Sequence, residues 1–253
     1  MGPFKPARSP PMDSALADQI LTHLHQVDEQ RLLRDQQPGL SAQVQALKRY
    51  QQQRFANTYA DLLMSARYQG AARFFLQELY GPGDYTRRDA QFARVVPALV
   101  KLFPADVVDT VARLARLHAI SERLDTLMAE QLRSTHIEAP AYWRAWQACQ
   151  QAELRQLQIT LTVAVGESLE NLTRKPLLRH ALRMMRGPAT GAGMGELQAF
   201  LESGFDTFRA MHGAAEFLAT VKERETKLAA ALFSSSRLLA EVPGGEDPLN
   251  SLP

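Results

Sequence analysis

The sequence contains only one cysteine, Cys149, among its 253 residues, so an intramolecular disulfide is excluded. No stretch reaches the roughly 18 consecutive apolar residues that a membrane-spanning helix needs. The longest apolar run, residues 159–165, is interrupted by two threonines. The first 12 residues lack the apolar core of a signal peptide. These absences together predict a cytoplasmic protein that does not enter a membrane.

The sequence also lacks a large excess of positive or negative charge. The chain has 29 basic and 27 acidic residues and a formal net charge of +2. Binding to nucleic acids or to acidic membrane surfaces depends on clustered positive charge, which such a balance does not supply. Nucleic acid is therefore not expected as a partner.

The common catalytic and metal-binding motifs are missing as well. None of the six histidines has a glutamate three residues before it, which excludes the standard helical di-iron site. Neither His-Glu-x-x-His nor Gly-Lys-Ser/Thr occurs, so the helical zinc-protease motif and the Walker loop are excluded. No cofactor is predicted. Haem held by a single histidine, His118 or His180, needs no motif and stays open.

What the chain does contain is apolar residues at helical spacing from end to end, with no segment that alternates with period two. This predicts an all-α fold, a single bundle-like domain of about eight to ten helices. Residues 1–12, with four prolines, are expected to form a disordered leader, 13–233 the helical domain and 234–253 a disordered tail. A boundary between two lobes would fall near 134–140.

Turn and cap signals predict where the helices begin and end. The first helix is expected to start after a cap at Asp13 or Ser14. Thr86 and Asp89 resemble a capping box at the start of another helix. The predicted segments are 14–37, 41–65, 71–80, 86–102 with a kink at Pro97, 105–132, 140–173 and 177–186, then a loop at 187–195 and two helices separated by Gly213.

The helix over 105–132 carries the first candidate site. His118, Glu122 and Asp125 are separated by four and three residues, which places them on one side of a helix. Such a set could contribute to a metal or ligand site. The alternative is a structural network of hydrogen bonds and ion pairs between helices.

The segment from Arg73 to Arg94 carries the second candidate. Arginines suit carboxylate or phosphate ligands, and here they surround two tyrosines. The alternative is that the acidic residues of the segment neutralise the arginines and fix the corner between two helices. The candidate ligand-binding residues of the corner are Arg73, Tyr80, Asp84, Arg88, Asp89 and Arg94. A site is expected if His118 and the arginines at 73, 88 and 94 converge on one cavity.

Two further features have plain structural interpretations. The glycine-rich loop 187–195 could hold a phosphate at a helix N-terminus, but it follows a helix and Glu196 adds negative charge, so a flexible connection is favoured. Trp143 and Trp146 are expected in the core or at a protein interface.

Several short motifs resemble a family of uncharacterised helical proteins from proteobacteria. They are Phe74-Phe75-Leu76, Leu79-Tyr80-Gly81-Pro82, Asp84-Tyr85, Arg88-Asp89, Lys175-Pro176-Leu177-Leu178, Met184-Met185-Arg186-Gly187-Pro188 and Gly204-Phe205-Asp206-Thr207-Phe208-Arg209. The resemblance covers residues of about 40–233 and implies a bacterial, cytoplasmic protein. It implies no activity, cofactor or catalytic residue.

The sequence leaves two alternative functions open. The first is a non-catalytic scaffold that works through a protein partner or self-association. The second is a helical pocket that binds or acts on a small ligand, through His118, Glu122 and Asp125 or through the arginine corner. The sequence itself contains no catalytic signature that would favour an enzyme.

Overall fold

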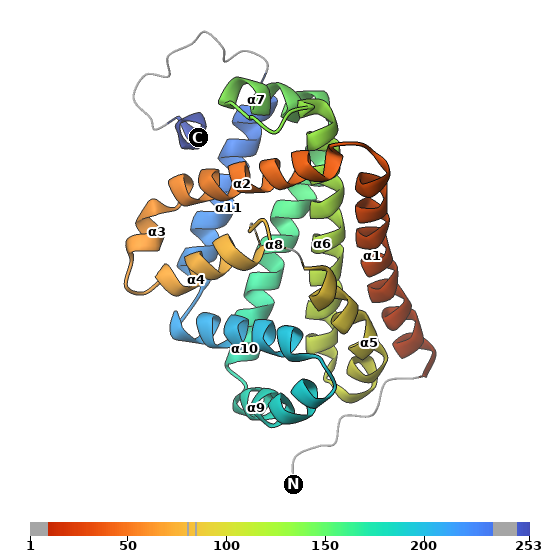
Figure 1. The fold of residues 1–253 in the computed structure, drawn as a ribbon. Coiled ribbons are helices and arrows are strands. Elements are labelled where there is room, and N and C mark those ends of the chain that lie inside the picture. Colours follow the sequence, from red (N-terminus) through yellow and green to blue (C-terminus); the bar gives the residue numbers. More distant parts are fainter. Residues whose placement is uncertain (1–9, 80, 84, 235–246) are drawn as a thin grey trace.

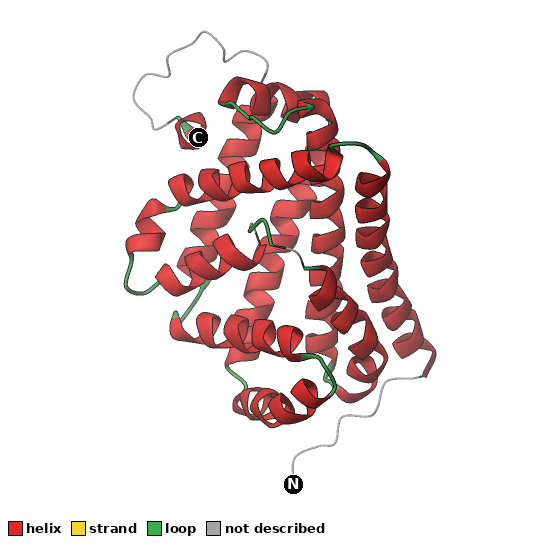
Figure 2. Cartoon of the chain, in the orientation of Figure 1, coloured by secondary structure: helices red, strands yellow, loops and turns green. Residues whose placement is uncertain are grey.

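The computed structural model describes residues 10–79, 81–83, 85–234 and 247–253. Throughout these ranges the regular structure is helical and no strand occurs (Figure 2). The described residues form eleven α-helices, which confirms the all-α prediction and slightly exceeds the expected number. Within the same ranges, none of the helices combines the length and the apolar character needed to cross a membrane.

The helices follow one another with short connections. Their bounds are α1 (Pro10–Gln36), α2 (Leu40–Thr58), α3 (Ala60–Met64), α4 (Gln69–Phe74), a π-helical turn (Phe75–Leu79), α5 (Thr86–Leu102), α6 (Ala105–Leu132), α7 (Ala139–Ala148), α8 (Ala152–Thr173), α9 (Pro176–Gly191), α10 (Gly195–Ala210) and α11 (Ala215–Phe233), then a 3₁₀ turn (Pro248–Ser251).

Helices α6 and α8 lie side by side at the centre (Figure 1). Helix α1 packs along one side of α6, α2 crosses it, and α11 packs against α8. Helices α7 and α9 lie at opposite ends of the molecule in the same view. Because so many elements pack on α6, its side chains face the interior on several sides.

Several helix boundaries differ from the sequence-based prediction. The single helix expected over 41–65 is two helices, α2 and α3, which are separated at Tyr59. Helix α1 begins earlier, at Pro10. The single helix expected over 140–173 is two helices, because residues 149–151 turn the chain and Gln150 adopts a positive φ of 51°. Helix α9 continues through Gly187 and Pro188 to Gly191, so most of the predicted glycine-rich loop is helical. Local sequence signals do not register such effects of packing.

The predicted aromatic segment ends in a π-helical turn, residues Phe75–Leu79, in place of a continuous α-helix. Gly81 then packs against this turn. A Cβ atom at Gly81 would lie 2.1 Å from the carbonyl oxygen of Gln77, so only glycine fits. The same oxygen accepts a hydrogen bond of 2.6 Å from the hydroxyl of Tyr85. This arrangement fixes the connection between α4 and α5 at two points.

Part of the expected disordered tail is ordered. Leu249 and Leu252 pack against the apolar cluster that contains Trp143 and Trp146. The side-chain amide of Asn57 in α2 donates a hydrogen bond of 3.1 Å to the carbonyl of Ser251. Residues 1–9 of the expected leader and 235–246 of the expected tail lie outside the described residues.

Candidate functional site

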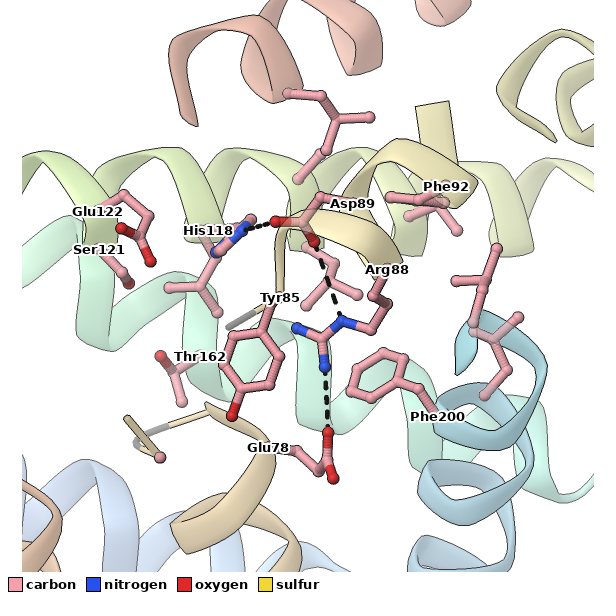
Figure 3. A pocket seen from close by; sticks show the side chains of 18 of the residues that line it. Glu78, Tyr85, Arg88, Asp89, Phe92, His118, Ser121, Glu122, Thr162 and Phe200 are labelled. Carbon is pink, nitrogen blue, oxygen red and sulfur yellow. Dashed lines mark hydrogen bonds and ion pairs between the residues drawn. The ribbon is translucent and has the colours of Figure 1, made fainter. Parts of the chain in front are cut away.

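A cavity of about 150 Å³ lies where α5, α6, α8 and α10 meet the middle of α2 and the π-helical turn. Apolar side chains form much of its wall, and polar side chains gather on one side (Figure 3). These polar residues come from four helices and from the segment between α4 and α5. They are Lys48, Gln51, Glu78, Tyr85, Arg88, Asp89, His118, Ser121, Glu122, Asp125, Gln158 and Thr162.

Asp89, in the first turn of α5, connects three elements of the site. Its Oδ2 atom lies 2.8 Å from Nε2 of His118 in α6 and accepts a hydrogen bond of 2.5 Å from Nη2 of Arg31 in α1. Burial alone would raise the pKa of Asp89, but the hydrogen bonds from His118 and Arg31 outweigh burial and hold it below its usual range. Asp89 is therefore ionised at neutral pH.

This placement corrects the predicted capping box. The N-cap residue of α5 is Tyr85, with no capping hydrogen bond from its side chain. The carboxylate of Asp89 binds two residues of other helices, although a carboxylate in a first helical turn commonly serves its own helix. The local motif correctly marked the start of the helix and wrongly assigned the role of Asp89.

Glu122 forms a buried ion-pair cluster one turn after His118. Its two carboxylate oxygens each accept a hydrogen bond of 2.6 Å, one from Arg34 of α1 and one from Lys48 of α2. Arg34 also donates to the backbone carbonyl of Glu122 and to the hydroxyl of Thr126. Burial alone would raise the pKa of Glu122, but Lys48 and Arg34 lower it to about 2. This cluster holds α1, α2 and α6 together.

Asp125, the next acidic residue of α6, has a different environment. Its Oδ1 accepts a hydrogen bond of 3.2 Å from the side-chain amide of Gln51, which is a neutral partner. Burial raises the pKa of Asp125 above its usual range. Nearby, Ser121 accepts a hydrogen bond of 2.8 Å from the amide of Gln158 in α8. On this part of the wall, Asp125 and Ser121 thus pair with side-chain amides.

Arg88 lies at the boundary between the polar and apolar parts of the wall. Its guanidinium group is 4.0 Å from the ring centroid of Tyr85 and 4.3 Å from that of Phe200. Its Nη1 atom donates a hydrogen bond of 3.1 Å to Glu78, the residue that the π-helical turn directs into the cavity. Stacking between two rings and pairing with a carboxylate fix the position of Arg88.

The structure brings together only some of the residues that the sequence suggested. Arg88, Asp89, His118, Glu122 and Asp125 line one cavity. Arg73 and Arg94 are exposed and do not line it. Tyr80 and Asp84, also suggested by the sequence, lie outside the described residues. His118 and one arginine thus converge on a cavity, as the hypothesis of a ligand site requires, whereas the other two arginines do not.

Sequence reasoning missed the basic residues that support this site. The signal was present: Leu24 and Val27 lie on the apolar face of α1, and Arg31 and Arg34 continue that face at helical spacing. In α2, Lys48 and Gln51 follow Val44 in the same way. Basic side chains that continue an apolar face indicate a buried charge cluster.

Metal and haem binding find little support at these positions. Among the residues that the structure describes, no group of three or more His, Cys, Asp or Glu side chains is arranged to hold a metal ion. The Nε2 atom of His118, a usual ligand atom for metals and haem, is hydrogen-bonded to Asp89. If that bond is donated by Nε2, Nδ1 is the proton acceptor of the ring.

The arrangement offers hydrogen-bonding groups beside an apolar surface. The protonated form of Asp125 is a donor, the hydroxyl of Ser121 is both donor and acceptor, and His118 is oriented by Asp89 as a base would be. A solute that enters the cavity would meet these groups on one side and carbon atoms on the other, which is typical of small-molecule sites.

Comparison with known proteins gives a family for this chain. The model of a family described as a domain of unknown function (DUF8198) matches residues 29–238. The chain therefore belongs to this family. The resemblance to an uncharacterised helical family, noted from the sequence motifs, is thus confirmed. No curated protein and no solved structure matches the chain.

Proposed function

We propose that this member of the family is a small-molecule-binding protein whose site is the cavity around His118, Ser121 and Asp125. The observation that carries the proposal is that polar side chains of five separate chain segments converge on a cavity of about 150 Å³. These groups pair with one another, yet they leave a cavity between the pairs, whereas a purely structural network would pack closely and leave no such space.

The ion pairs around the cavity support a binding role because they make the polar wall rigid. Glu122 is held by two cations, and His118 is fixed by a carboxylate that is itself held by Arg31. The second set of groups, Asp125, Ser121 and Gln158, lines the space that these pairs enclose. A binding site is most effective when its contact residues are oriented in advance by neighbours in this way.

The test uses butanol and butyramide as water-soluble probes and follows the amide and side-chain NMR signals of the whole protein. We expect concentration-dependent shifts at residues that line the cavity. A Ser121→Phe variant fills the cavity and should abolish those shifts. The matched control is Ser134→Phe, at an exposed position just after α6. Shifts that persist in folded Ser121→Phe, or that never appear in the wild type, would contradict the proposal.

The scaffold function predicted from the sequence is supported by fewer observations than the binding site. Trp143 and Trp146, which motivated it, are buried at 8% and 9% exposure, so they do not offer a surface for a partner. Other large apolar side chains are exposed instead, among them Leu102 at 78%, Leu177 at 83% and Met184 at 66%. Self-association through them would appear in size-exclusion chromatography with light scattering, and a strict monomer that captures no partner would count against it.

A further inference from the structure

A second, larger cavity adjoins the proposed site. It has a volume of about 310 Å³ and lies between α5, α6, α8, α9 and α10. The two cavities share lining residues on every helix that separates them, among them Leu99, Leu114, Thr162, Leu197 and Phe200. The polar cavity and this apolar chamber are therefore neighbours with a common wall of side chains. The volume of the chamber alone is in the range of about 300–1,000 Å³ that ligand sites occupy.

The apolar chamber offers almost no polar group to a ligand. None of its lining residues is charged, and its polar side chains are Thr110, Thr162 and Gln198. Each of these already donates to a carbonyl of the protein: Thr110 to Asp106, Thr162 to Gln158, and Gln198 to Leu182. Water gains little in such a space because it finds few hydrogen-bond partners, whereas a hydrocarbon fits it.

The chamber reaches the surface between α5 and α9. Leu102 and Met185 line it and are 78% and 42% exposed. Leu178, Leu182, Met185 and Ala189 line it from α9 at helical spacing. An apolar chain thus has an entrance at this end of the molecule, and the polar cavity lies at the inner end of its path.

The polar cavity is electrically balanced, which restricts the other end of the ligand. Asp89 is paired with Arg31, and Glu78 is paired with Arg88. Glu122 is paired with both Arg34 and Lys48. The remaining groups that a ligand would meet are Asp125, whose hydrogen-bond partner is the neutral Gln51, and the neutral Ser121. A negatively charged head group would find no cation here that another group does not already hold. A positively charged head group would meet only Asp125, a carboxyl whose pKa burial raises. Burial of either charge would be costly.

Resting on the proposed function, we infer that the ligand is an uncharged single-chain lipid with a hydroxyl or carbonyl head. Its head forms hydrogen bonds with Asp125 and Ser121, and its hydrocarbon chain passes the rings of Tyr85 and Phe200 into the apolar chamber. The stacked position of Arg88 between these rings marks the boundary between head and chain.

The experiment compares probes with the same chain and different heads, and probes with the same head and different chains. Delipidated full-length protein is titrated by calorimetry with decanol, decanoate, decylamine and butanol. We expect decanol to bind at least about tenfold more tightly than decanoate or decylamine, because burying an unpaired charge is unfavourable. Decanol should also bind at least about tenfold more tightly than butanol, because it buries more apolar surface.

Two variants on α9 test where the hydrocarbon chain of the ligand binds. Ala189 is buried and lines the chamber, so Ala189→Phe fills it and should weaken decanol binding about tenfold while leaving butanol binding unchanged. Ala181→Phe is the matched control, because Ala181 lies on the same helix but does not line the chamber. It should bind decanol as the wild type does. Circular dichroism confirms that both variants are folded.

Each outcome separates the two proposals. Equal or tighter binding of decanoate or decylamine, or affinity that does not rise from butanol to decanol, overturns the lipid inference. In that case, binding of butanol that is lost in Ser121→Phe would still support the proposed function. If neither butanol nor decanol binds, both proposals fail.

Discussion

The polar cavity and the apolar chamber differ although they share part of their walls. Helices α5, α6, α8 and α10 contribute to both. Along α6 the lining residues are Val107, Val111 and Leu114 at the chamber, and His118, Glu122 and Asp125 at the polar cavity. What differs is the neighbour that completes each wall. Helices α1 and α2 bring buried cations to the second half of α6, whereas α9 brings leucine and methionine to the first half. Helix α6 therefore lines an apolar and a polar cavity, because different helices pack beside its two halves.

The largest effect should come from breaking the charge cluster on the polar side. Glu122→Gln leaves Arg34 and Lys48 buried without their carboxylate, and we expect it to destabilise the protein by about 3–5 kcal/mol. Urea unfolding measures the change. The control is Glu223→Gln, since Glu223 is exposed and pairs with exposed Lys227, so its loss should have little effect. Equal effects in the two variants would show that the buried cluster is not a special feature of this region.

Acid should weaken the same region without any mutation. The pKa of Glu122 is lowered from 4.5 to about 2, so the folded state holds the ionised form more strongly than the unfolded state does. Its contribution is complete above about pH 4.5 and is lost as the pH falls toward 2, a loss of about 3 kcal/mol. Lys48, Arg34 and His118 are the groups that face it. The free energy of unfolding measured across this range should fall less steeply in Glu122→Gln.

Substitution of two leucines by alanine compares a tightly packed part of the interior with a part that lines the cavities. Leu124 is fully buried within an apolar cluster, whereas Leu197 lines both cavities. Leu124→Ala should cost about 4 kcal/mol and Leu197→Ala about 2 kcal/mol, because the side of Leu197 that faces a cavity has fewer contacts to lose. Thermal and urea unfolding provide the comparison. If Leu197→Ala costs as much as Leu124→Ala in the ligand-free protein, the cavities are filled by side-chain rearrangement in solution.

The smallest effect concerns two adjacent arginines at the boundary. The side chain of Arg88 is 13% exposed and is stacked between two rings, so Arg88→Ala should cost about 1–2 kcal/mol. The side chain of Arg87 is 76% exposed and pairs with Glu196 at the surface, so Arg87→Ala should cost less than about 0.5 kcal/mol. A reversed order would mean that the corner is stabilised mainly from its surface.

The sequence predicted those parts of the site that depend on one helix. Spacing alone placed His118, Glu122 and Asp125 on one side of α6, and the structure confirms it. The partners Arg31, Arg34 and Lys48 come from 58 or more residues away on other helices. Local periodicity carries no information about which helices pack together. The exposed Arg73 and Arg94 were grouped with Arg88 because they are near in sequence, although helix rotation directs them elsewhere.

The same limit explains the errors in the fold. The break at Gln150 lies within a continuous helical pattern, and the positive φ of Gln150 separates α7 from α8 although both helices pack on α6 and α11. Conversely, Gly187 and Pro188 normally end a helix, but in α9 the helix continues through them until Ala189 packs into the interior. In α9, burial farther along the chain thus overrides local propensity.

The π-helical turn at Phe75–Leu79 affects how the side chains that follow are rotated about the helix axis. A π-helical ring contains one more residue than an α-helical ring. Deletion of one residue there would restore the α-helical phase and rotate the following side chains by about 100° around the axis. Phe75 would still be buried, but Glu78 would point away from Arg88. The extra residue in this turn thus determines the direction in which Glu78 points into the cavity. An insertion or deletion here would therefore affect the site more strongly than most substitutions.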